Sequence, residues 1–194
     1  MKKLFTLTKP LVVGIPKSRF FSNAFVCAFC ASWLIALGAH IKVPFYPVPM
    51  TMQTFAIALV ALLTPWPAAI SAVLLYLSYA AVGLPVLASG NKGLLGLTGP
   101  TAGFLVGMVL MSGVIAALTK RYKDSGVLIR FGFVLIGSLF VFVPGLSFLT
   151  HLFSWEIALQ TGLLPFIFSE PTKLALAAYL SVFIQNRGRE HNSG

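Results

Sequence analysis

The chain has 194 residues, of which 58% are hydrophobic and only 9% are charged. Soluble globular domains carry about 25% charged residues, so this composition excludes a water-soluble enzyme, and its high hydrophobic content excludes a disordered chain. The formal net charge is +10, from 14 lysines and arginines against 4 acidic residues. In a soluble protein this balance would suggest nucleic acid. Here the basic residues lie in loops and tails, where the positive-inside rule explains them, so we expect no nucleic-acid partner.

Long uncharged stretches indicate that the chain crosses a membrane several times. They cover residues 20–41, 43–91, 93–119 and 131–155. A helix needs about 20 apolar residues to cross a bilayer, and the second stretch is long enough to cross twice. The strands of a β-barrel would alternate apolar and polar residues, whereas these stretches are continuously apolar. We therefore predict an all-α integral membrane protein in the lipid bilayer.

Helix-breaking residues divide the chain into six predicted transmembrane helices. In chain order, these cover about residues 22–39, 50–64, 67–82, 100–119, 127–143 and 171–186. Pro65-Trp66-Pro67 forms a reversal between the second and third helices, and Gly83-Leu84-Pro85 ends the third. Pro144-Gly145 is predicted to end the fifth helix. An amphipathic connection over residues 146–161 then leads towards the sixth.

Two predicted loops have unusual compositions. Residues 40–49 contain Pro44, Pro47 and Pro49, which forbid a continuous helix and predict an extended, aromatic-bearing loop. Residues 88–103 are rich in glycine, which predicts a loop that folds closely against another part of the protein.

The distribution of basic residues predicts the orientation in the membrane. Six spans place both termini on one side, which carries eleven basic residues, whereas the other side has only Lys42 and Lys92. Both termini are therefore predicted to be cytoplasmic, in a multi-pass protein of the cytoplasmic membrane. We divide the chain into a basic cytoplasmic arm (residues 1–21), a six-helix transmembrane domain (22–186) and a short basic cytoplasmic tail (187–194).

Glu170 and Lys173 form the most informative ionisable pair. Pro171 suits the first position of a helix, which leaves Ser169 or Glu170 near the helix cap. Three positions apart, Glu170 and Lys173 lie close to one helix face. An ionisable residue within a span costs about 2.5–3.5 kcal/mol on insertion scales, so it normally faces a cavity or a partner. The pair predicts either a site for a polar, partly anionic small molecule or a structural ion pair at the interface, with Lys173 snorkelling.

Three further residues on the outer side are candidate ligand contacts. Asn91 lies in the glycine-rich loop, and its amide offers donors and an acceptor, although asparagine also favours turns. Gln53 and Tyr46 are weaker candidates, because Gln53 can equally cap the second helix and Tyr46 can equally anchor the proline loop at the interface. The remaining aromatic candidates are expected to be packing or interface residues, namely Trp33, Tyr76 and Tyr79.

Small residues form a stripe on the first predicted helix. Ala24, Ala28, Ser32 and Ala36 recur at four-residue spacing. Such a stripe lets another helix approach closely, whether it comes from the same chain or from a partner. On the residues alone, packing within the chain is the preferred interpretation.

Several catalytic and binding motifs are missing from the sequence. There is no G-x-x-x-x-G-K-[ST] for a P-loop and no G-x-S-x-G, while His40, His151 and His191 are isolated from other metal ligands. Cys27 and Cys30 are expected to be small packing residues of a membrane helix. We therefore expect no enzymatic activity, no metal and no bound cofactor.

Three stretches follow one another in a distinctive order. They are residues 47–54 (PVPMTMQT), residues 81–86 (AVGLPV) leading through Gly90-Asn91 to residues 99–103 (GPTAG), and Pro165-Phe166 leading to Glu170 and Lys173. In order and spacing, over about residues 20–185, they resemble the BioY family, the biotin-binding S components of energy-coupling factor (ECF) transporters. The second stretch is the most specific.

This resemblance implies a six-helix, S-component-like bundle that captures biotin from outside, as a transported ligand and not a cofactor. It also implies a separate transmembrane T component and paired ATPases, which supply the energy. The polar ligands of the family correspond to Asn91, Glu170 and Lys173. Ala24 and Ala28 match the A-x-x-x-A feature with which S components dock on the T component, and the resemblance therefore favours a docking role for this stripe.

The chain departs from the family pattern before the last helix. The family commonly has Pro-Gly-Asp there, whereas this chain has Phe168-Ser169-Glu170 followed by Pro171. Glutamate keeps the charge but adds a methylene group, so the depth and affinity of the pocket depend on it. The alternatives are an S component for another small vitamin or precursor, or a non-transporting structural membrane protein.

Overall fold

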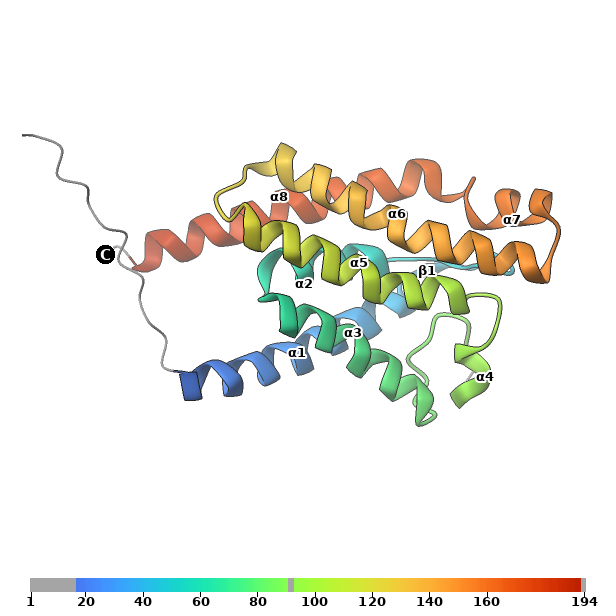
Figure 1. Ribbon diagram of the computed structural model, residues 1–194, viewed down its shortest axis with the longest axis horizontal. Coiled ribbons are helices and arrows are strands. Elements are labelled where there is room, and N and C mark those ends of the chain that lie inside the picture. Colours follow the sequence, from blue (N-terminus) through green and yellow to red (C-terminus); the bar gives the residue numbers. More distant parts are fainter. Residues whose placement is uncertain (1–16, 91–92, 193–194) are drawn as a thin grey trace, which may run out of the picture.

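The computed structural model describes residues 17–90 and 93–192, with side chains for residues 24–90 and 93–188. The helices form an elongated bundle (Figure 1). In chain order the elements are α1 (Lys17–His40), β1 (Lys42–Val43), β2 (Met50–Thr51), α2 (Gln53–Leu63), α3 (Trp66–Ala81), α4 (Gly93–Leu97), α5 (Ala102–Arg121), α6 (Val127–Leu152), α7 (Trp155–Gly162) and α8 (Phe166–Asn192). The start of α1 and the end of α8 lie at the same end of the bundle, as an even number of spans requires (Figure 1).

Helix α2 is the centre of the bundle. It packs against α1, α3, α5, α6 and α8. Its sequence, QTFAIALVALL, is apolar on every side after the first two residues, which is typical of a helix that neighbours surround completely. The polar residues Gln53 and Thr54 at its outer end are buried as well, so they lie inside the bundle.

Glycines allow α5 and α6 to pack closely. A Cβ atom added at Gly103 would lie 2.3 Å from the carbonyl oxygen of Pro144, and one at Gly107 would lie 2.5 Å from that of Phe140. No side chain fits in these gaps, so the two backbones approach each other directly. This small-residue packing is a principal means of helix association in membranes.

Helix α6 is longer than the sequence predicted. The prediction that Pro144-Gly145 ends this helix is wrong, because α6 continues through Pro144 to Leu152. Proline is tolerated within a membrane helix when a neighbour covers the freed backbone groups. Here Gly107 of α5 lies against the Phe140 carbonyl, which has lost its donor at Pro144. The connection predicted over residues 146–161 is therefore shorter, because its first part belongs to α6 and its second part forms α7.

Helix α8 begins earlier than predicted. It starts at Phe166, so Pro171 lies inside the helix and Glu170 is a helical residue, not a cap. The outer loops also contain more regular structure than predicted. Lys42–Val43 pairs with Met50–Thr51 as a two-stranded antiparallel ladder around the proline loop, and α4 lies in the glycine-rich segment.

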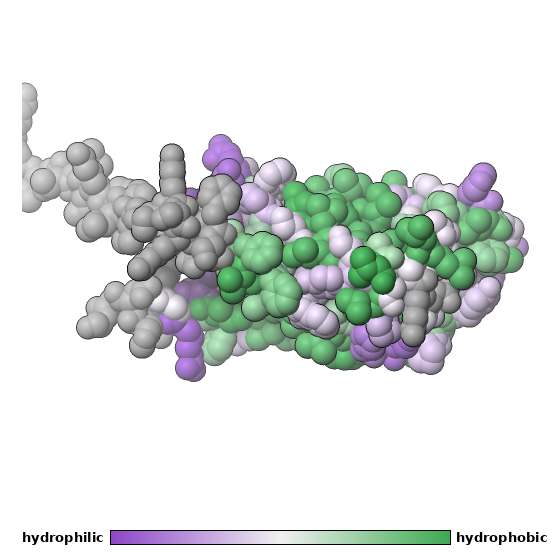
Figure 2. Space-filling view, turned by 90° about the horizontal axis from the view of Figure 1, so that it is seen from below, coloured by the Kyte–Doolittle hydropathy of each residue, from purple (hydrophilic) through white to green (hydrophobic). Residues whose placement is uncertain are grey.

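The exterior of the bundle is apolar. Exposed large side chains include Phe168, Leu128 and Val82, and hydrophobic residues cover the middle of the molecule while hydrophilic ones gather towards its two ends (Figure 2). Three helical stretches are long and apolar enough to cross a membrane, namely Ala102–Arg121, Val127–Leu152 and Trp155–Gly188, and three shorter apolar helices accompany them. The prediction of an all-α membrane protein is confirmed, and the six predicted spans correspond to α1, α2, α3, α5, α6 and α8.

Residues at the ends of the predicted domain are only partly described. Helix α1 includes residues 17–21 of the predicted arm, and the rest of the arm lies outside the described residues. Cys27 and Cys30 lie on helix α1, as predicted, and both are exposed, so they do not pack against the described part of the bundle.

Arg130 is a buried polar centre at the cytoplasmic end. It is only 1% exposed. Its guanidinium donates to the Ser125 carbonyl (3.1 Å), to Ser181 Oγ (3.1 Å) and to Gln185 Oε1. Sequence reasoning counted Arg130 only as a cytoplasmic charge, whereas in the structure it ties α6 and the preceding loop to α8.

We expect Gly107→Ala to destabilise the protein. The new Cβ would meet the backbone of α6, and overpacking of this kind costs about 1–3 kcal/mol. The same change at Gly132, which has nothing within 4 Å of an added Cβ, should leave stability unchanged or slightly raised. Thermal unfolding of the two purified variants in detergent checks this, and equal melting temperatures would show that the close contact is unimportant.

Candidate functional site

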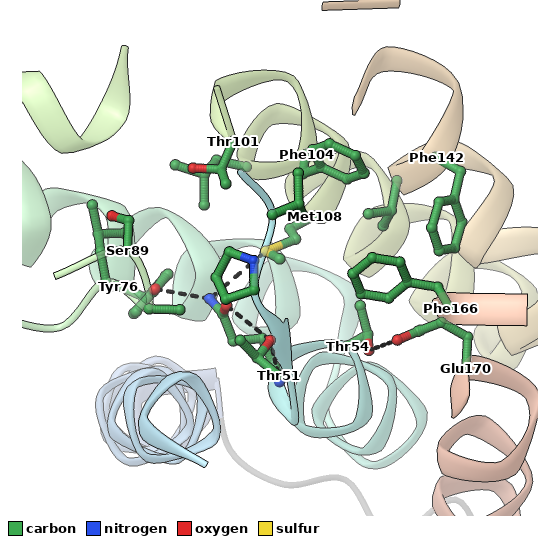
Figure 3. A pocket seen from close by; sticks show the side chains of 17 residues that line it. Thr51, Thr54, Tyr76, Ser89, Thr101, Phe104, Met108, Phe142, Phe166 and Glu170 are labelled. Atoms are coloured by element: carbon green, nitrogen blue, oxygen red, sulfur yellow. Dashed lines mark hydrogen bonds between the residues drawn. The ribbon is translucent and has the colours of Figure 1, made fainter. Parts of the chain in front are cut away.

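A cavity of about 50 Å³ lies at the outer end of α2. Figure 3 shows it between α2, α3, α5, α6 and α8, with polar side chains on two opposite sides and aromatic side chains between them. Pockets for drug-sized ligands hold about 300–1,000 Å³, so the space in the described conformation is smaller than such a ligand needs. The lining residues are Val48, Pro49, Thr51, Gln53, Thr54, Tyr76, Leu87, Ala88, Ser89, Thr101, Phe104, Leu105, Met108, Val141, Phe142, Phe166 and Glu170.

The first polar side is an ion pair held by α2. Lys173 Nζ donates to Glu170 Oε1, to the Thr51 carbonyl (2.8 Å) and to Thr54 Oγ1 (3.4 Å). The Thr54 hydroxyl in turn donates to Glu170 Oε1 (3.0 Å). All three donor positions of the ammonium group therefore have acceptors within the chain.

Glu170 keeps one oxygen available. Its side chain is buried, and Oε2 has no hydrogen-bond partner among the described residues. Glu170 lines the cavity beside Phe166 (Figure 3). An unsatisfied buried acceptor costs about 1–3 kcal/mol or more when charged, so Oε2 is ready to accept a donor from a ligand.

The second polar side is a chain of hydrogen bonds across α2 and α3. Gln53 Nε2 donates to the Tyr76 hydroxyl (2.8 Å), which donates to the Val86 carbonyl (3.3 Å). Thr51 Oγ1 donates to Gln53 Oε1 (3.0 Å). Tyr76 is fully buried, so this network fixes the orientation of the Gln53 amide at the cavity wall.

Aromatic and aliphatic side chains separate the two polar sides. Phe142 meets Phe166 edge to face, with ring centroids 5.8 Å apart, and it meets Phe104 in the same way at 6.3 Å. Met108 and Leu87 complete this apolar surface. The cavity can therefore hold a flat or bicyclic apolar body with polar groups at its edges.

The structure brings three of the predicted site residues together. Glu170 and Gln53 line opposite sides of one cavity at the outer end of α2, Lys173 pairs with Glu170, and the predicted approach of Glu170 to Lys173 on one helix face is confirmed. Tyr46 is 83% exposed and lines a separate outer hollow, so it does not contact the cavity in this conformation. Asn91 lies outside the described residues, and its role stays a prediction.

The small-residue stripe of α1 faces the interior over most of its length. Ala28, Ser32 and Ala36 are buried, and Ser32 Oγ donates to the Tyr79 hydroxyl of α3 (3.2 Å). Ala24 is half-buried. In this chain the stripe supports the packing of α1 on α3, and docking of a partner through Ala24 and Ala28 stays a prediction.

Sequence reasoning missed the roles of Thr51, Thr54 and Tyr76. The two threonines belong to the PVPMTMQT stretch. Their positions on either side of Gln53, at the start of a predicted helix, are the sequence feature that could have indicated a role in the site. Tyr76 was interpreted as a packing or interface residue, whereas its hydroxyl forms part of the cavity network. Nothing in the sequence places residue 76 opposite residue 53.

The groups that line the cavity are suited to binding a small molecule. No group of three or more His, Cys, Asp or Glu side chains lies together within residues 17–90 and 93–192. The cavity offers a carboxylate acceptor, an oriented amide and an apolar wall. These groups can recognise N–H donors and a carbonyl on a small, largely apolar molecule.

Comparison with known proteins gives consistent matches. Residues 11–190 match the model of the BioY family. The chain is 36% identical over 153 residues to biotin transporter BioY2 of Lactococcus lactis, covering 74% of this chain and 83% of that protein. It is also 36% identical over 155 residues to biotin transporter BioY of Thermotoga maritima, covering 77% and 88%. The crystal structure of the S-component for biotin from an ECF-type ABC transporter matches with a TM-score of 0.75 and 25% identity, over 89% of this chain and 95% of that chain.

We expect Lys173→Met to destabilise the protein strongly. Removing one partner of a buried ion pair costs about 3–5 kcal/mol, because Glu170 is left with an uncompensated charge. Adding Glu170→Gln to the Lys173→Met variant should restore most of the lost stability.

Thermal unfolding of the single and double variants checks this prediction. Lys120→Met is the matched control, because Lys120 is exposed and the same substitution there removes no buried pair. A double variant as unstable as Lys173→Met would show that lost packing, and not the unpaired carboxylate, causes the effect.

Proposed function

The chain belongs to the BioY family, and from this premise we propose that it takes up biotin across the cytoplasmic membrane. It captures biotin from the outer side and releases it inside, without chemistry on the substrate. A separate T component and a pair of ATPases supply the energy, because the chain has no P-loop sequence of its own. The observation that carries this proposal is the cavity at the outer end of α2, lined by Glu170, whose Oε2 has no partner among the described residues.

The chemistry of the cavity fits the chemistry of biotin. Biotin has a ureido ring with two N–H donors and one carbonyl acceptor, an apolar bicyclic body and a carboxylate tail. Glu170 Oε2 can accept from a ureido N–H, since it is the buried acceptor without a partner among the described residues. The aromatic surface of Phe104, Phe142 and Phe166 contacts the bicyclic body in this arrangement.

The tail of biotin is assigned to the outer part of the cavity. All donor positions of Lys173 already have acceptors, so Lys173 acts mainly by holding Glu170 in place. The hydroxyl groups of Ser89 and Thr101 line the cavity towards the glycine-rich segment, and they can donate to a carboxylate. Asn91 follows Ser89 closely in the sequence and is proposed to contribute on this side.

Entry of biotin requires the outer loops to move. The cavity holds about 50 Å³, and Val48 and Pro49 of the proline loop line it together with Ala88 and Ser89 of the next outer loop. Lys42 Nζ donates to the Ala88 carbonyl (2.5 Å) and links these two loops. Opening them exposes the cavity to the outer side while the cytoplasmic half of α2 stays packed.

We expect purified protein to bind biotin tightly, and the Glu170→Ala and Lys173→Ala variants to lose this binding. Truncating one partner of a buried, hydrogen-bonded charge pair costs about 2–5 kcal/mol, or roughly 30-fold or more in affinity. Calorimetry on detergent-purified protein measures the effect. Glu156→Ala is the matched control, because Glu156 lies exposed on α7 and does not line the cavity.

Two results would contradict this function. Folded wild-type protein that gives neither heat nor a thermal shift with biotin would favour a structural membrane protein. Competition by thiamine or riboflavin, but not by biotin, would favour an S component for another vitamin.

We also expect Tyr76→Phe to weaken biotin binding about tenfold. Without the hydroxyl, Gln53 Nε2 keeps only the weak contact with Met108 Sδ (4.0 Å), and an unsatisfied buried donor costs about 1–3 kcal/mol. Tyr79→Phe is the matched control, since the Tyr79 hydroxyl contacts Ser32 between α1 and α3. Titrations of both variants with biotin check this, and equal affinities would show that the network does not support the ligand.

A further inference from the structure

A second hollow, of about 530 Å³, opens at the cytoplasmic end of the bundle. It lies between the α2–α3 turn, the last turn of α5 and the cytoplasmic part of α8, at the end of α2 opposite to the biotin cavity. In Figure 1 these segments lie at the end where α1 begins and α8 ends. The hollow is therefore at the level of the inner membrane surface.

Two unpaired lysines line this hollow. Lys120 and Lys123 are exposed, and neither ammonium group has a hydrogen bond or an ion pair with any described residue. The nearest carboxylate in the sequence, Asp124, already has an interaction of its own. The positive charges of Lys120 and Lys123 are therefore not neutralised by any described acidic side chain in the hollow.

Three arginines of this end have described side chains, and all three are engaged elsewhere. The Arg121 guanidinium lies over the ring of Tyr122 at 5.6 Å, and that of Arg187 lies over Phe183 at 5.1 Å. Arg130 is buried behind the loop. Lys120 and Lys123 differ from these three arginines because the two lysines line the hollow and the arginines do not.

Two neutral donors complete the polar part of the hollow. Gln185 Oε1 accepts from Arg130, so the amide oxygen is engaged, and the NH₂ group has no acceptor among the described residues. The Trp66 indole is half-exposed, and its N–H has no acceptor among the described residues. Ammonium, amide and indole donors together match the acceptor oxygens of a phosphate group.

The inner wall of the hollow is apolar. Leu62, Leu63 and Ala116 line the part that reaches into the bundle, and Pro67 lies beside Trp66 at its edge. The lining thus changes from aliphatic to cationic towards the membrane surface. A soluble anion would use only the cationic part, whereas an amphiphile with an anionic head uses both.

We propose that this hollow binds the headgroup of an anionic phospholipid from the inner leaflet, with its phosphate at Lys120 and Lys123 and the start of its acyl chains along Leu62 and Leu63. The inner leaflet is rich in anionic lipid, and basic hollows between membrane helices on this side suit such headgroups. The bound lipid neutralises the two lysines and fills the space between α2, α5 and α8. This site is independent of the biotin cavity at the opposite end.

The test compares lipid retention by two double variants with equal charge changes. Lys120→Gln with Lys123→Gln removes the charges of the hollow, and Arg121→Gln with Arg187→Gln removes two cytoplasmic charges outside it. Full-length protein in detergent is titrated with phosphatidylglycerol or phosphatidylcholine, and bound lipid is counted by native mass spectrometry. Wild type should retain phosphatidylglycerol preferentially, and the lysine variant should bind it about 30-fold more weakly, since each lysine contributes about a fivefold factor.

Four results would overturn the proposal. Equal loss in the arginine variant would show general charge attraction, and no preference for phosphatidylglycerol would show that the headgroup is not recognised. Inorganic phosphate that displaces the lipid at similar concentration would identify a site for a free anion. Unchanged lipid binding together with lost co-purification of the T component would assign the hollow to that protein. Biotin binding by each variant is measured alongside, so a misfolded variant is recognised.

Discussion

The ion pair between Glu170 and Lys173 constrains the whole outer half of the molecule. A carboxylate and an ammonium group taken out of water lose several kcal/mol each unless their remaining hydrogen-bonding positions are satisfied. Thr51 and Thr54 satisfy them, because the start of α2 stands directly opposite this turn of α8. The register of α2 against α8 is therefore fixed by polar atoms at a point where the surrounding packing is apolar. One carboxylate oxygen, Glu170 Oε2, is left without a partner among the described residues, and Glu170 lines the cavity.

This arrangement depends on the way in which α2 is enclosed. Helix α2 has only 11 residues, but five other helices surround it. The close approach of α5 and α6 at Gly103 and Gly107 brings Phe104 and Phe142 together above its outer end. Phe142 lies within α6, two residues before Pro144. The aromatic wall of the cavity is thus a consequence of glycine packing between two neighbouring helices.

The charged side chains at the two ends of the bundle have different surroundings. At the outer end, the charges of Glu170 and Lys173 on α8 neutralise each other. Glu170 Oε2 is left without a partner among the described residues, and Glu170 lines the small cavity. At the cytoplasmic end, Arg130 is satisfied internally by carbonyl and side-chain oxygens, while Lys120 and Lys123 line a larger hollow and have no partner in the part of the chain that the structure describes. A compact ligand with N–H donors fits the first environment, and a negatively charged lipid surface fits the second. The opposite placement of these two sites agrees with a protein that receives its ligand on one side and meets anionic lipid on the other.

The sequence by itself determined the class of the protein and several of its parts. Continuous apolar stretches require helices in a bilayer, because no other backbone arrangement without alternation satisfies its own hydrogen bonds there. The three-residue spacing of Glu170 and Lys173 was enough to predict their approach, since both lie on one helix. The tertiary structure decided whatever depends on neighbours. It carried α6 through Pro144, turned Ala28 and Ser32 towards α3, and placed Tyr76 opposite Gln53. These outcomes follow from how helices distant in the sequence cover each other's backbone and polar groups, and no local pattern records that information.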